Sequence, residues 1–332
     1  MNKTRIAING FGRIGRAAAR IITAREDLQL VAINDLLDIT LSEHLFEFDS
    51  TYGKFDGSAS INTDANTMTL NGDTVQYFSE RSIDDLPWAK LNVDVVLECT
   101  GIFRTAETAG KHITSGAKKV VLSAPCKSNG FETIVLGVND ENINESAQLY
   151  SNASCTTNCL APLCKALNDA LNIEKGTMTT IHSYTNNQRV LDAAHKDPRR
   201  ARAAGLNIIP TTTGAAKALG TVLPELDGKM SGISVRVPTP TVSLVDLVCT
   251  VGKSTTVEEV TEILQAYSNK NPDVMGMEAR PLVSSDYKMD SRSCVIDMPN
   301  IIVQKDLVKV LAWYDNEWGY ASRLVELAAK VA

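Results

Sequence analysis

The chain has 332 residues, a length that predicts about two domains. Apolar residues (44%) and charged residues (22%) stand in ordinary globular proportions, which argues against long disordered or low-complexity regions. The net charge is −6, from 33 Lys and Arg against 39 Asp and Glu, so a dedicated nucleic-acid binder is disfavoured. Any pocket for an anion must then be built locally, against the overall sign of the charge.

Neither the N-terminus nor any later stretch indicates export or membrane insertion. The apolar run at 6–10 is too short for a signal peptide, and no stretch approaches the roughly 20 apolar residues of a membrane helix. Seven cysteines spread over a long chain do not resemble a disulfide framework. We therefore expect a cytoplasmic protein with free thiols. Cys155 and Cys159 are four residues apart, but no second Cys/His pair lies near them, so we predict no metal site.

In the first half of the chain, short apolar strands alternate with helices. The pattern predicts strands at 5–9, 28–33, 93–97 and 120–122 and helices at 13–24 and 106–115. This alternation indicates parallel βαβ units and a Rossmann-type, doubly wound α/β sheet. Residues 54–80 differ, because they alternate apolar and polar around Asn71-Gly72, which predicts an inserted antiparallel hairpin.

After Cys155 the pattern changes to long alternating runs at 177–185, 233–237, 243–251 and 308–314. They predict a second, α+β domain with a largely antiparallel sheet. We expect helices at 160–171, 257–268 and 321–331. The segment 186–210 is long, basic and weakly periodic, which is typical of a functional or interfacial loop.

The first strand leads into a glycine-rich turn of the dinucleotide-binding type. Gly10, Gly12 and Gly15 form a GxGxxG that follows a strand and opens a helix. Such glycines permit a tight turn, close approach of a pyrophosphate, and close packing of helix on strand. Asp35 lies 20 residues after Gly15, at the end of the second strand, where an acidic group binds the ribose 2′-OH of NAD. The pattern predicts NAD binding, and a carboxylate at Asp35 favours NAD over NADP.

The segment 151–159 is polar, made of small residues and placed just before a helical pattern. A cysteine at a helix start, here Cys155, meets the positive end of the helix dipole, which favours its thiolate. His182, on a predicted strand, is its candidate partner. Of the other three histidines, His44 and His112 stand in predicted helices without notable sequence neighbours, and His195 stands in the basic segment.

Three segments together resemble phosphorylating glyceraldehyde-3-phosphate dehydrogenases: INGFGRIGR at 8–16, SNASCTTNC at 151–159 and WYDNEWGY at 313–320. The resemblance extends over essentially the whole chain. It implies oxidation of D-glyceraldehyde 3-phosphate with NAD and inorganic phosphate to 1,3-bisphosphoglycerate. Cys155 matches the nucleophile that forms a thiohemiacetal and then a thioester, and His182 matches its base. We expect these two to stand as a thiolate–imidazolium pair.

The resemblance also implies the ligand-binding residues. The matches for the cofactor, beyond the glycines and Asp35, are Arg13, Ile14, Arg81, Ser123 and Asn316. The matches for the two phosphate groups are Ser154, Thr156, Thr213 and Gly214 at one anion site, and Thr185, Arg200 and Arg236 at the other or between them. Hydroxyls, backbone N–H groups and guanidinium forks suit phosphate oxygens.

The family resemblance further implies an NAD-binding domain at 1–154, a catalytic domain at 155–317, and a C-terminal helix at 318–332 that packs back on the first. It also implies a homotetramer in which 186–210 is buried between subunits, with no membrane and no dedicated nucleic-acid site. One departure concerns the cofactor. Ala193-Ala194 stand where many NAD-specific members carry Leu-Pro, so tolerance of NADP remains open.

Two alternatives remain open from the sequence. An erythrose-4-phosphate dehydrogenase shares the cysteine segment, although such relatives tend to lose the signature that Thr213-Gly214 keeps here. A protein that binds NAD without turnover, such as an adhesin, could keep the fold. The complete set of Cys155, His182 and the phosphate-binding residues favours the dehydrogenase.

Overall fold

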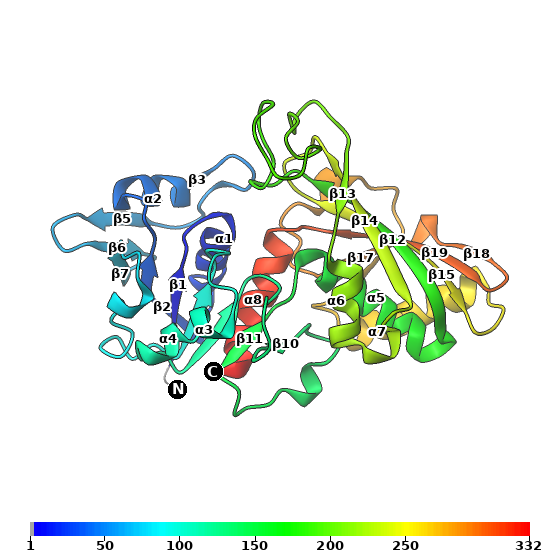
Figure 1. Ribbon diagram of the computed structural model, residues 1–332, viewed down its shortest axis with the longest axis horizontal. Helices are drawn as coiled ribbons and strands as arrows, with labels where there is room; N and C mark the ends of the chain where they lie inside the picture. The colour runs from blue at the N-terminus through cyan, green and yellow to red at the C-terminus, as the bar shows by residue number, and fades with distance from the viewer. Residues whose placement is uncertain (1–2) are drawn as a thin grey trace. The chain divides into compact units, whose positions relative to one another are not determined.

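A computed structural model describes residues 3–332. The chain divides into two compact units (Figure 1). Unit 1 contains the residues up to Ile134 together with Asn142–Ala153 and Ala321–Ala332. Unit 2 contains Val135–Glu141 and Ser154–Tyr320. In the part of the chain that is described, no helix combines the length and apolar character needed to cross a membrane.

Unit 1 is built on a nine-stranded sheet with the order β10-β11-β9-β8-β1-β2-β7-β6-β5. The strands are β1 (Thr4–Asn9), β2 (Leu28–Asn34), β5 (Ala59–Asn62), β6 (Thr67–Leu70), β7 (Asp73–Phe78), β8 (Val95–Glu98), β9 (Lys119–Leu122), β10 (Glu132–Thr133) and β11 (Leu149–Ser151). All neighbouring pairs from β10 to β7 are parallel. The central strands are buried along nearly their whole length, which explains their continuous runs of Val, Ile, Leu and Ala.

The first three helices of unit 1 each follow a strand of the sheet, and the fourth follows the third. They are α1 (Arg13–Ile22), α2 (Ile39–Glu47), α3 (Ala106–Ala109) and α4 (Lys111–Thr114), and the short pair β3 (Phe48–Asp49) and β4 (Gly53–Lys54) follows α2. The helix predicted at 106–115 is divided at Gly110, a residue type that weakens a helix interior. These elements confirm the doubly wound, Rossmann-type architecture.

The predicted hairpin is confirmed between β6 and β7, which pair antiparallel. Asn71 and Gly72 between them both have positive φ angles, 50° and 90°, the combination that a tight type I′ turn requires. The structure adds a third strand, β5, to this meander, and β7 joins it to the parallel sheet through β2.

Unit 2 contains a sheet with the order β13-β14-β12-β15-β19-β17-β16, to which β18 is attached through β19. Its strands are β12 (Ile173–Ser183), β13 (Ile209–Thr212), β14 (Met230–Val237), β15 (Ser243–Val251), β16 (Met275–Glu278), β17 (Cys294–Asp297), β18 (Ile302–Gln304) and β19 (Leu307–Tyr314). The pairing is largely antiparallel, as predicted, with parallel pairs at β12/β14 and β16/β17.

Three α-helices lie in unit 2, and a fourth begins in unit 2 and continues in unit 1. They are α5 (Cys155–Leu171), α6 (Ala215–Val222), α7 (Val257–Lys270) and the C-terminal α8 (Trp318–Val331). Figure 1 shows α5 beside α6 and α7, and α5 also contacts β12, β15, β17 and β19. The helix predicted to begin at residue 160 begins at Cys155, because the Ser154 hydroxyl accepts a hydrogen bond from Thr157 N at 3.1 Å and caps the first turn.

Candidate functional site: a nucleotide pocket and a cysteine–histidine centre

The glycine-rich turn in unit 1 has the geometry that its sequence predicts. Gly10 has φ = +96°, and a Cβ there would lie 2.6 Å from Thr100 N, so the residue must lack a side chain. A Cβ on Gly15 would overlap the Gly10 carbonyl oxygen. Gly12, by contrast, has no atom near its missing Cβ and stands at the N-cap of α1, without a side chain to satisfy the first N–H groups. The turn therefore presents an open helix N-terminus to an anion.

Beside this turn, unit 1 has a cavity of about 490 Å³ whose lining includes Gly10, Gly12, Asp35 and Arg81. The Asp35 carboxylate is held in place by two backbone donors, Phe11 N at 2.6 Å and Leu37 N at 2.9 Å. The cavity, the open turn and a fixed carboxylate at the end of β2 fit the phosphates and ribose of a dinucleotide.

The other cofactor matches in unit 1 lie outside the lining of this cavity. The Arg13 guanidinium forms an ion pair with Asp49 and lies 5.4 Å from the centre of the Tyr52 ring. Ile14 follows it in the first turn of α1. Ser123 follows β9, where its backbone N–H donates to Glu98 O at 3.0 Å. At the start of α1, backbone N–H groups are therefore better placed for an anion than the Arg13 side chain.

In unit 2, the first residue of α5 lies beside a side chain of β12. Cys155 Sγ is 3.6 Å from His182 Nε2. His182 Nδ1 lies 2.7 Å from the carbonyl oxygen of Ser183, and we assign the tautomer whose Nδ1–H donates to that oxygen, which is the tautomer that a base at Nε2 requires. This assignment leaves Nε2 as the nitrogen with a lone pair, directed at the sulfur. The arrangement is that of a nucleophile next to a base.

Strand register determines the charge next to this pair. β12 and β14 run parallel with His182 opposite Arg236, and Arg236 Nη1 lies 2.9 Å from His182 Nδ1. Arg236 Nη1 also donates to Ser183 O at 3.0 Å. Burial and the Arg236 charge lower the pKa of His182 to about 3. Burial raises the pKa of the Cys155 thiol, although Arg236 opposes this rise.

Both pKa shifts run against the thiolate–imidazolium pair predicted from the sequence, because they favour the thiol of Cys155 and the neutral imidazole of His182. The physical reason is that both groups are withdrawn from water and Arg236 already supplies a positive charge beside the imidazole. The cation that favours a Cys155 thiolate is Arg236, not His182.

Arg200 approaches the same centre from the segment 186–210. Its Nε donates to Thr211 Oγ1 at 2.9 Å and its Nη2 to Thr212 O at 3.0 Å, which ties the guanidinium to β13. Thr211 in turn donates to Asp197 at 2.7 Å. The Arg200 charge also contributes to lowering the pKa of His182, so the two arginines act on one centre.

The predicted phosphate-binding hydroxyls lie at helix starts and strand ends in unit 2. Ser154 caps α5, and Thr156 is buried in its first turn. Thr213 Oγ1 accepts from Ala215 N at 3.2 Å, and Gly214 stands at the N-cap of α6. Thr185, two residues beyond β12, is half-buried. Two helix N-termini thus stand on unit 2, each with a hydroxyl from this set.

Sequence reasoning assigned no role to Tyr314, at the end of β19. Its hydroxyl lies 2.9 Å from Thr156 Oγ1 and 2.8 Å from Thr180 Oγ1, and its ring meets the His182 ring edge-on at 6.0 Å between centres. Tyr314 thereby joins α5, β12 and β19 behind the Cys155–His182 pair. Its place in the 313–320 segment was the only sequence signal, since its partners are up to 158 residues away.

Asn316 follows β19 and is buried. Its side-chain oxygen accepts from Ser183 Oγ at 2.8 Å and from Ser243 Oγ at 3.0 Å. Both hydrogen bonds use the same atom, so they fix the amide with its NH₂ group turned away from the two serines. Within the described residues, no cluster of three His, Cys, Asp or Glu side chains could hold a metal ion, and all seven cysteines are free thiols.

Comparison with known protein families gives two matches. The family model described as "Glyceraldehyde 3-phosphate dehydrogenase, NAD binding domain" matches residues 4–106. The model described as "Glyceraldehyde 3-phosphate dehydrogenase, C-terminal domain" matches residues 154–316. The first match contains the glycine-rich turn and Asp35, and the second contains Cys155 and His182.

Curated relatives are similar over nearly the whole chain. Glyceraldehyde-3-phosphate dehydrogenase 2 of Synechocystis sp. is 52% identical, covering 99% of this chain and 98% of the relative. Glyceraldehyde-3-phosphate dehydrogenase 1 of Bacillus subtilis is 48% identical with the same coverage. The chloroplastic glyceraldehyde-3-phosphate dehydrogenase A of Chlamydomonas reinhardtii is 49% identical, covering 99% of this chain and 89% of the relative.

Proposed function

The chain belongs to the glyceraldehyde-3-phosphate dehydrogenase family and is an NAD-dependent phosphorylating oxidoreductase, and from that premise we propose how its residues perform the reaction. The substrates are D-glyceraldehyde 3-phosphate, inorganic phosphate and NAD, and the carbon product is 1,3-bisphosphoglycerate. The observation that carries the residue assignment is the 3.6 Å contact of Cys155 Sγ with His182 Nε2 at the start of α5.

Covalent bond formation begins at the Cys155 sulfur. His182 Nε2 accepts the thiol proton as the sulfur attacks the aldehyde carbon and a C–S bond forms, and it then returns that proton to the former carbonyl oxygen to give a thiohemiacetal. The Cys155 backbone N–H, at the first position of α5, is our candidate donor to that oxygen. The positive charge of Arg236 stabilises the thiolate that develops during the attack.

Oxidation then converts the thiohemiacetal into a thioester. His182 Nε2 removes the hydroxyl proton while the hydrogen on the same carbon leaves as a hydride. NAD, when bound, supplies the acceptor for this hydride. An oxygen of inorganic phosphate next attacks the thioester carbon, the C–S bond breaks, and Cys155 regains its proton as the acyl phosphate forms.

We propose that the two anions use the predicted sets of residues in unit 2. One set is Ser154, Thr156, Thr213 and Gly214, and the other is Thr185, Arg200 and Arg236. Support comes from the two helix N-termini and from the tethering of Arg200 to β13, since both fix positive potential before a ligand arrives. A bound phosphate ester would also offset the Arg236 and Arg200 charges and raise the pKa of His182 toward the range of a general base.

The cofactor residues are proposed from the geometry of each. Backbone N–H groups at Gly12, Arg13 and Ile14 would hold the pyrophosphate, and Asp35 would accept from the ribose hydroxyls. Arg81, Ser123 and Asn316 complete the set, with the Asn316 NH₂ group as donor to the nicotinamide carboxamide. We propose a preference for NAD, because the fixed Asp35 carboxylate would repel a 2′-phosphate.

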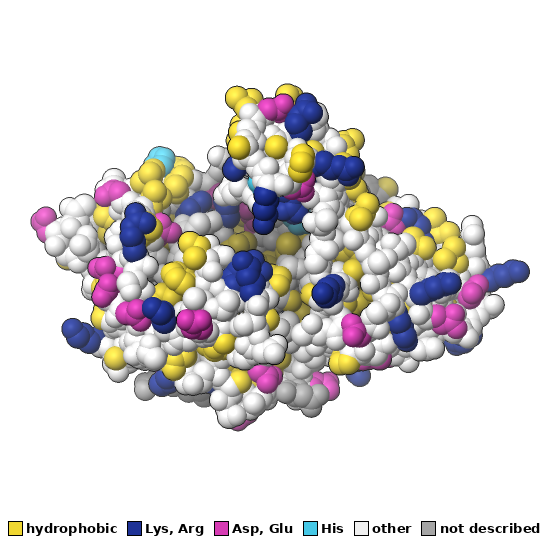
Figure 2. All heavy atoms as spheres, viewed as in Figure 1, with side chains coloured by type: hydrophobic (Ala, Val, Ile, Leu, Met, Phe, Trp, Pro, Cys, Tyr) yellow, Lys and Arg dark blue, Asp and Glu magenta, His cyan; other side chains and the backbone are white. Residues whose placement is uncertain are grey.

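At a larger scale, we propose an NAD-binding domain at 1–154 with the C-terminal helix at 318–332, a catalytic domain at 155–317, a cytoplasmic location and a homotetramer. Support for assembly comes from the segment 186–210, in which Val190, Leu191, Leu206 and Ile208 are strongly exposed apolar side chains. Apolar and basic side chains gather on this loop, at the top of Figure 2. Closed homo-oligomers bury such surfaces.

The experiment that tests the proposed function is a matrix of aldehydes and cofactors. Glyceraldehyde 3-phosphate, erythrose 4-phosphate and acetaldehyde are each assayed with NAD and with NADP, with and without inorganic phosphate. We expect the highest kcat/KM for the triose phosphate with NAD, and a single burst of NADH equal to the enzyme concentration when phosphate is omitted. Phosphate-independent turnover, or a higher kcat/KM for erythrose 4-phosphate, would contradict the proposal.

A further inference from the structure

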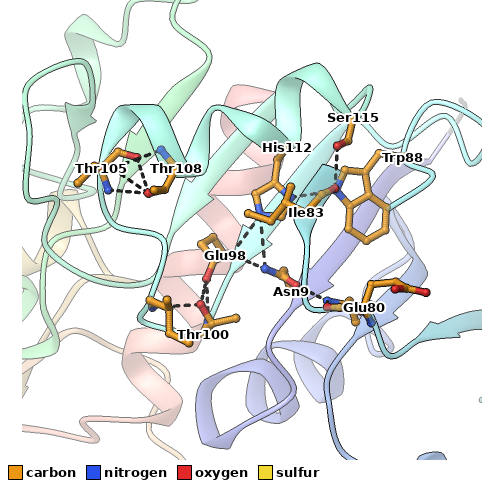
Figure 3. A network of polar contacts seen from close by, with 12 residues as sticks. Asn9, Glu80, Ile83, Trp88, Glu98, Thr100, Thr105, Thr108, His112 and Ser115 are labelled. Atoms are coloured by element: carbon orange, nitrogen blue, oxygen red, sulfur yellow. Dashed lines mark hydrogen bonds and ion pairs between the residues drawn. The ribbon is translucent and has the colours of Figure 1, made fainter. Parts of the chain in front are cut away.

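Unit 1 contains a carboxylate that none of the steps above uses. Glu98 ends β8 and is fully buried. Figure 3 shows that its two oxygens gather side chains from Asn9, Thr100 and His112. Asn9 Nδ2 lies 2.6 Å from Oε2 and His112 Nε2 lies 3.1 Å from the same atom. Thr100 N lies 2.8 Å from Oε1, and the Thr100 hydroxyl contacts it as well.

The contacts of Asn34, the last residue of β2, determine which group donates in the hydrogen bonds on that side of Glu98. The Asn34 amide pairs with the backbone of Glu80, accepting from its N–H at 2.8 Å and donating to its oxygen at 3.0 Å. Asn34 Nδ2 must therefore also be the donor to Asn9 Oδ1, at 2.7 Å. This donation turns the Asn9 NH₂ group toward Glu98.

The direction is also fixed on the side of α4. The indole N–H of Trp88 can only donate, and it lies 2.9 Å from His112 Nδ1. The proton of a neutral His112 ring is therefore on Nε2, which donates to Glu98. The Thr100 hydroxyl accepts from Ile102 N at 3.1 Å, so its own proton is directed to Glu98. All four partners of Glu98 are donors, which is the environment of an ionised carboxylate.

This network holds the turn that meets the nucleotide. Asn9 immediately precedes Gly10, and Asn34 immediately precedes Asp35. Gly10 is also in close contact with the backbone at Cys99 and Thr100, where its missing Cβ would lie 2.8 Å from Cys99 C and 2.6 Å from Thr100 N. Glu98 thus fixes both the residue before Gly10 and the backbone against which Gly10 packs. His112 is itself absent from the cavity lining that contains Gly10 and Asp35.

We propose that Glu98, held by His112, is a positioning residue for NAD: it sets the Gly10 turn and, through Asn9 and Asn34, the Asp35 carboxylate. The inference rests on NAD binding to unit 1. It assigns a role in cofactor affinity to two buried side chains that contact neither the cavity nor the Cys155–His182 centre. His112 has no notable neighbours in the sequence, because its partners Trp88 and Glu98 lie 24 and 14 residues away along the chain.

The direct test is Glu98→Gln, which keeps the shape but turns one oxygen into an NH₂ donor. Whichever way the amide lies, that NH₂ meets two groups that are themselves donors. We expect the Kd for NAD and for ADP-ribose to rise by about tenfold or more, since the turn no longer has one fixed conformation. At saturating NAD, kcat should stay within about threefold, because the chemical step uses residues of unit 2. Titration calorimetry and steady-state kinetics measure the two.

Two substitutions of His112 make the test independent of the folding of Glu98→Gln. His112→Leu removes both hydrogen bonds, whereas His112→Gln can accept from Trp88 with its oxygen and donate to Glu98 with its nitrogen. We expect His112→Leu to weaken NAD binding and His112→Gln to restore it. Ser268→Ala, which removes a buried hydrogen bond to Met275 O in unit 2, is the control that lowers stability without changing the Kd.

A purely structural role predicts lowered melting temperatures in Glu98→Gln and His112→Leu, with the Kd for NAD of the folded variants equal to that of the wild type. That result would overturn the proposal. Failure of the wild-type protein to bind NAD would instead contradict the proposed function. The two failures are distinguished because the wild-type titration is performed first.

Discussion

The reactivity of Cys155 is decided by which side chains share its surroundings. Withdrawal from water raises the pKa of its thiol, and the Arg236 charge is the largest influence in the opposite direction. Burial and the same guanidinium lower the pKa of His182, which leaves Nε2 able to accept a proton. One cation thus favours the nucleophile and preserves the base.

The assignment of the nucleophile predicts a clear difference between two nearby cysteines. Cys155→Ser should reduce turnover by at least about 10⁴-fold, because a serine hydroxyl next to a neutral imidazole is a far weaker nucleophile at neutral pH. The Kd for NAD should remain within about twofold. Cys159→Ser, one turn further along α5 and buried, is the matched control and should retain measurable thioester chemistry. Stopped-flow NADH formation with the triose phosphate distinguishes the two variants, and normal turnover in Cys155→Ser would place the nucleophile elsewhere.

The lowered pKa of His182 predicts a pH dependence of stability. The folded state holds the ring neutral down to about pH 3, whereas the unfolded chain binds a proton near the ordinary value of 6.5. Below 6.5 the unfolded state therefore binds more protons, and the free energy of unfolding falls by up to about 1.4 kcal/mol per pH unit from this group alone. This destabilisation by His182 is absent above about pH 7 and reaches its full size near pH 3.

His182→Asn should remove this contribution. Urea unfolding at pH 7, 6 and 5 is expected to show a smaller loss of stability in the variant than in the wild type, by up to about 2 kcal/mol over that range. His44→Asn, at an exposed position on α2, serves as the control and should follow the wild type. Parallel curves for wild type and His182→Asn would contradict a neutral, buried imidazole.

At the scale of elements, the turn between β1 and α1 shows how a short sequence motif encodes a local shape. Three glycines stand in it for different reasons: Gly10 for its positive φ and its contact with Thr100, Gly15 for the contact of α1 with the turn, and Gly12 for open space. Only the first two are required for folding. The third is required for a ligand to approach.

This difference predicts opposite phenotypes for two alanine variants. Gly10→Ala should lower the free energy of unfolding by at least about 2 kcal/mol, because a left-handed φ is unfavourable for alanine and its Cβ would collide with the backbone. The φ of −74° and ψ of −158° at Gly12 suit alanine, so the free energy of unfolding of Gly12→Ala should lie within about 1 kcal/mol of the wild-type value. This variant should nevertheless bind NAD about tenfold more weakly or worse, because the methyl group occupies the path of the pyrophosphate. Urea unfolding and NAD titration of both variants check the contrast, which equal stabilities would contradict.

At the scale of the whole molecule, the segment 186–210 exposes several large apolar side chains, a surface that suits an interface. Leu206 is 82% exposed and Val190 is 87% exposed. Two of the basic residues in this segment form ion pairs within it, with Asp192 and Asp197. Large exposed apolar side chains grouped on one loop favour burial against another copy of the chain.

The proposed homotetramer predicts a mass of four times 35.9 kDa by light scattering at micromolar concentration. Leu206→Glu should dissociate the assembly, because it would bury a carboxylate in an apolar contact. Val257→Glu is the matched control: this exposed side chain starts α7, outside the segment, where an acidic residue also suits the helix dipole. A wild-type monomer with full activity would contradict the prediction, as would an intact tetramer in Leu206→Glu.

The parts of the structure that could be predicted from the sequence are those encoded by residues close together in the chain. The βαβ alternation, the GxGxxG turn, the place of Asp35 at the end of a strand, and the presence of a helix after the polar segment 151–159 all depend on residues within about 20 positions of one another. Glycine, the helix-capping serine and apolar periodicity act on the nearby backbone, so their effect can be read without knowing the rest of the fold.

The charge states of the site residues and the contacts between residues far apart in the chain depend on the tertiary structure. Arg236 lies beside His182, 54 residues away, because β12 and β14 pair in parallel, and Asn9 meets Glu98 across 89 residues. Strand order and register are set by packing of the whole sheet, which no local pattern specifies. Burial likewise belongs to the assembled core, and it is burial, together with the Arg236 charge beside His182, that shifts the pKa values of Cys155 and His182 toward their neutral forms.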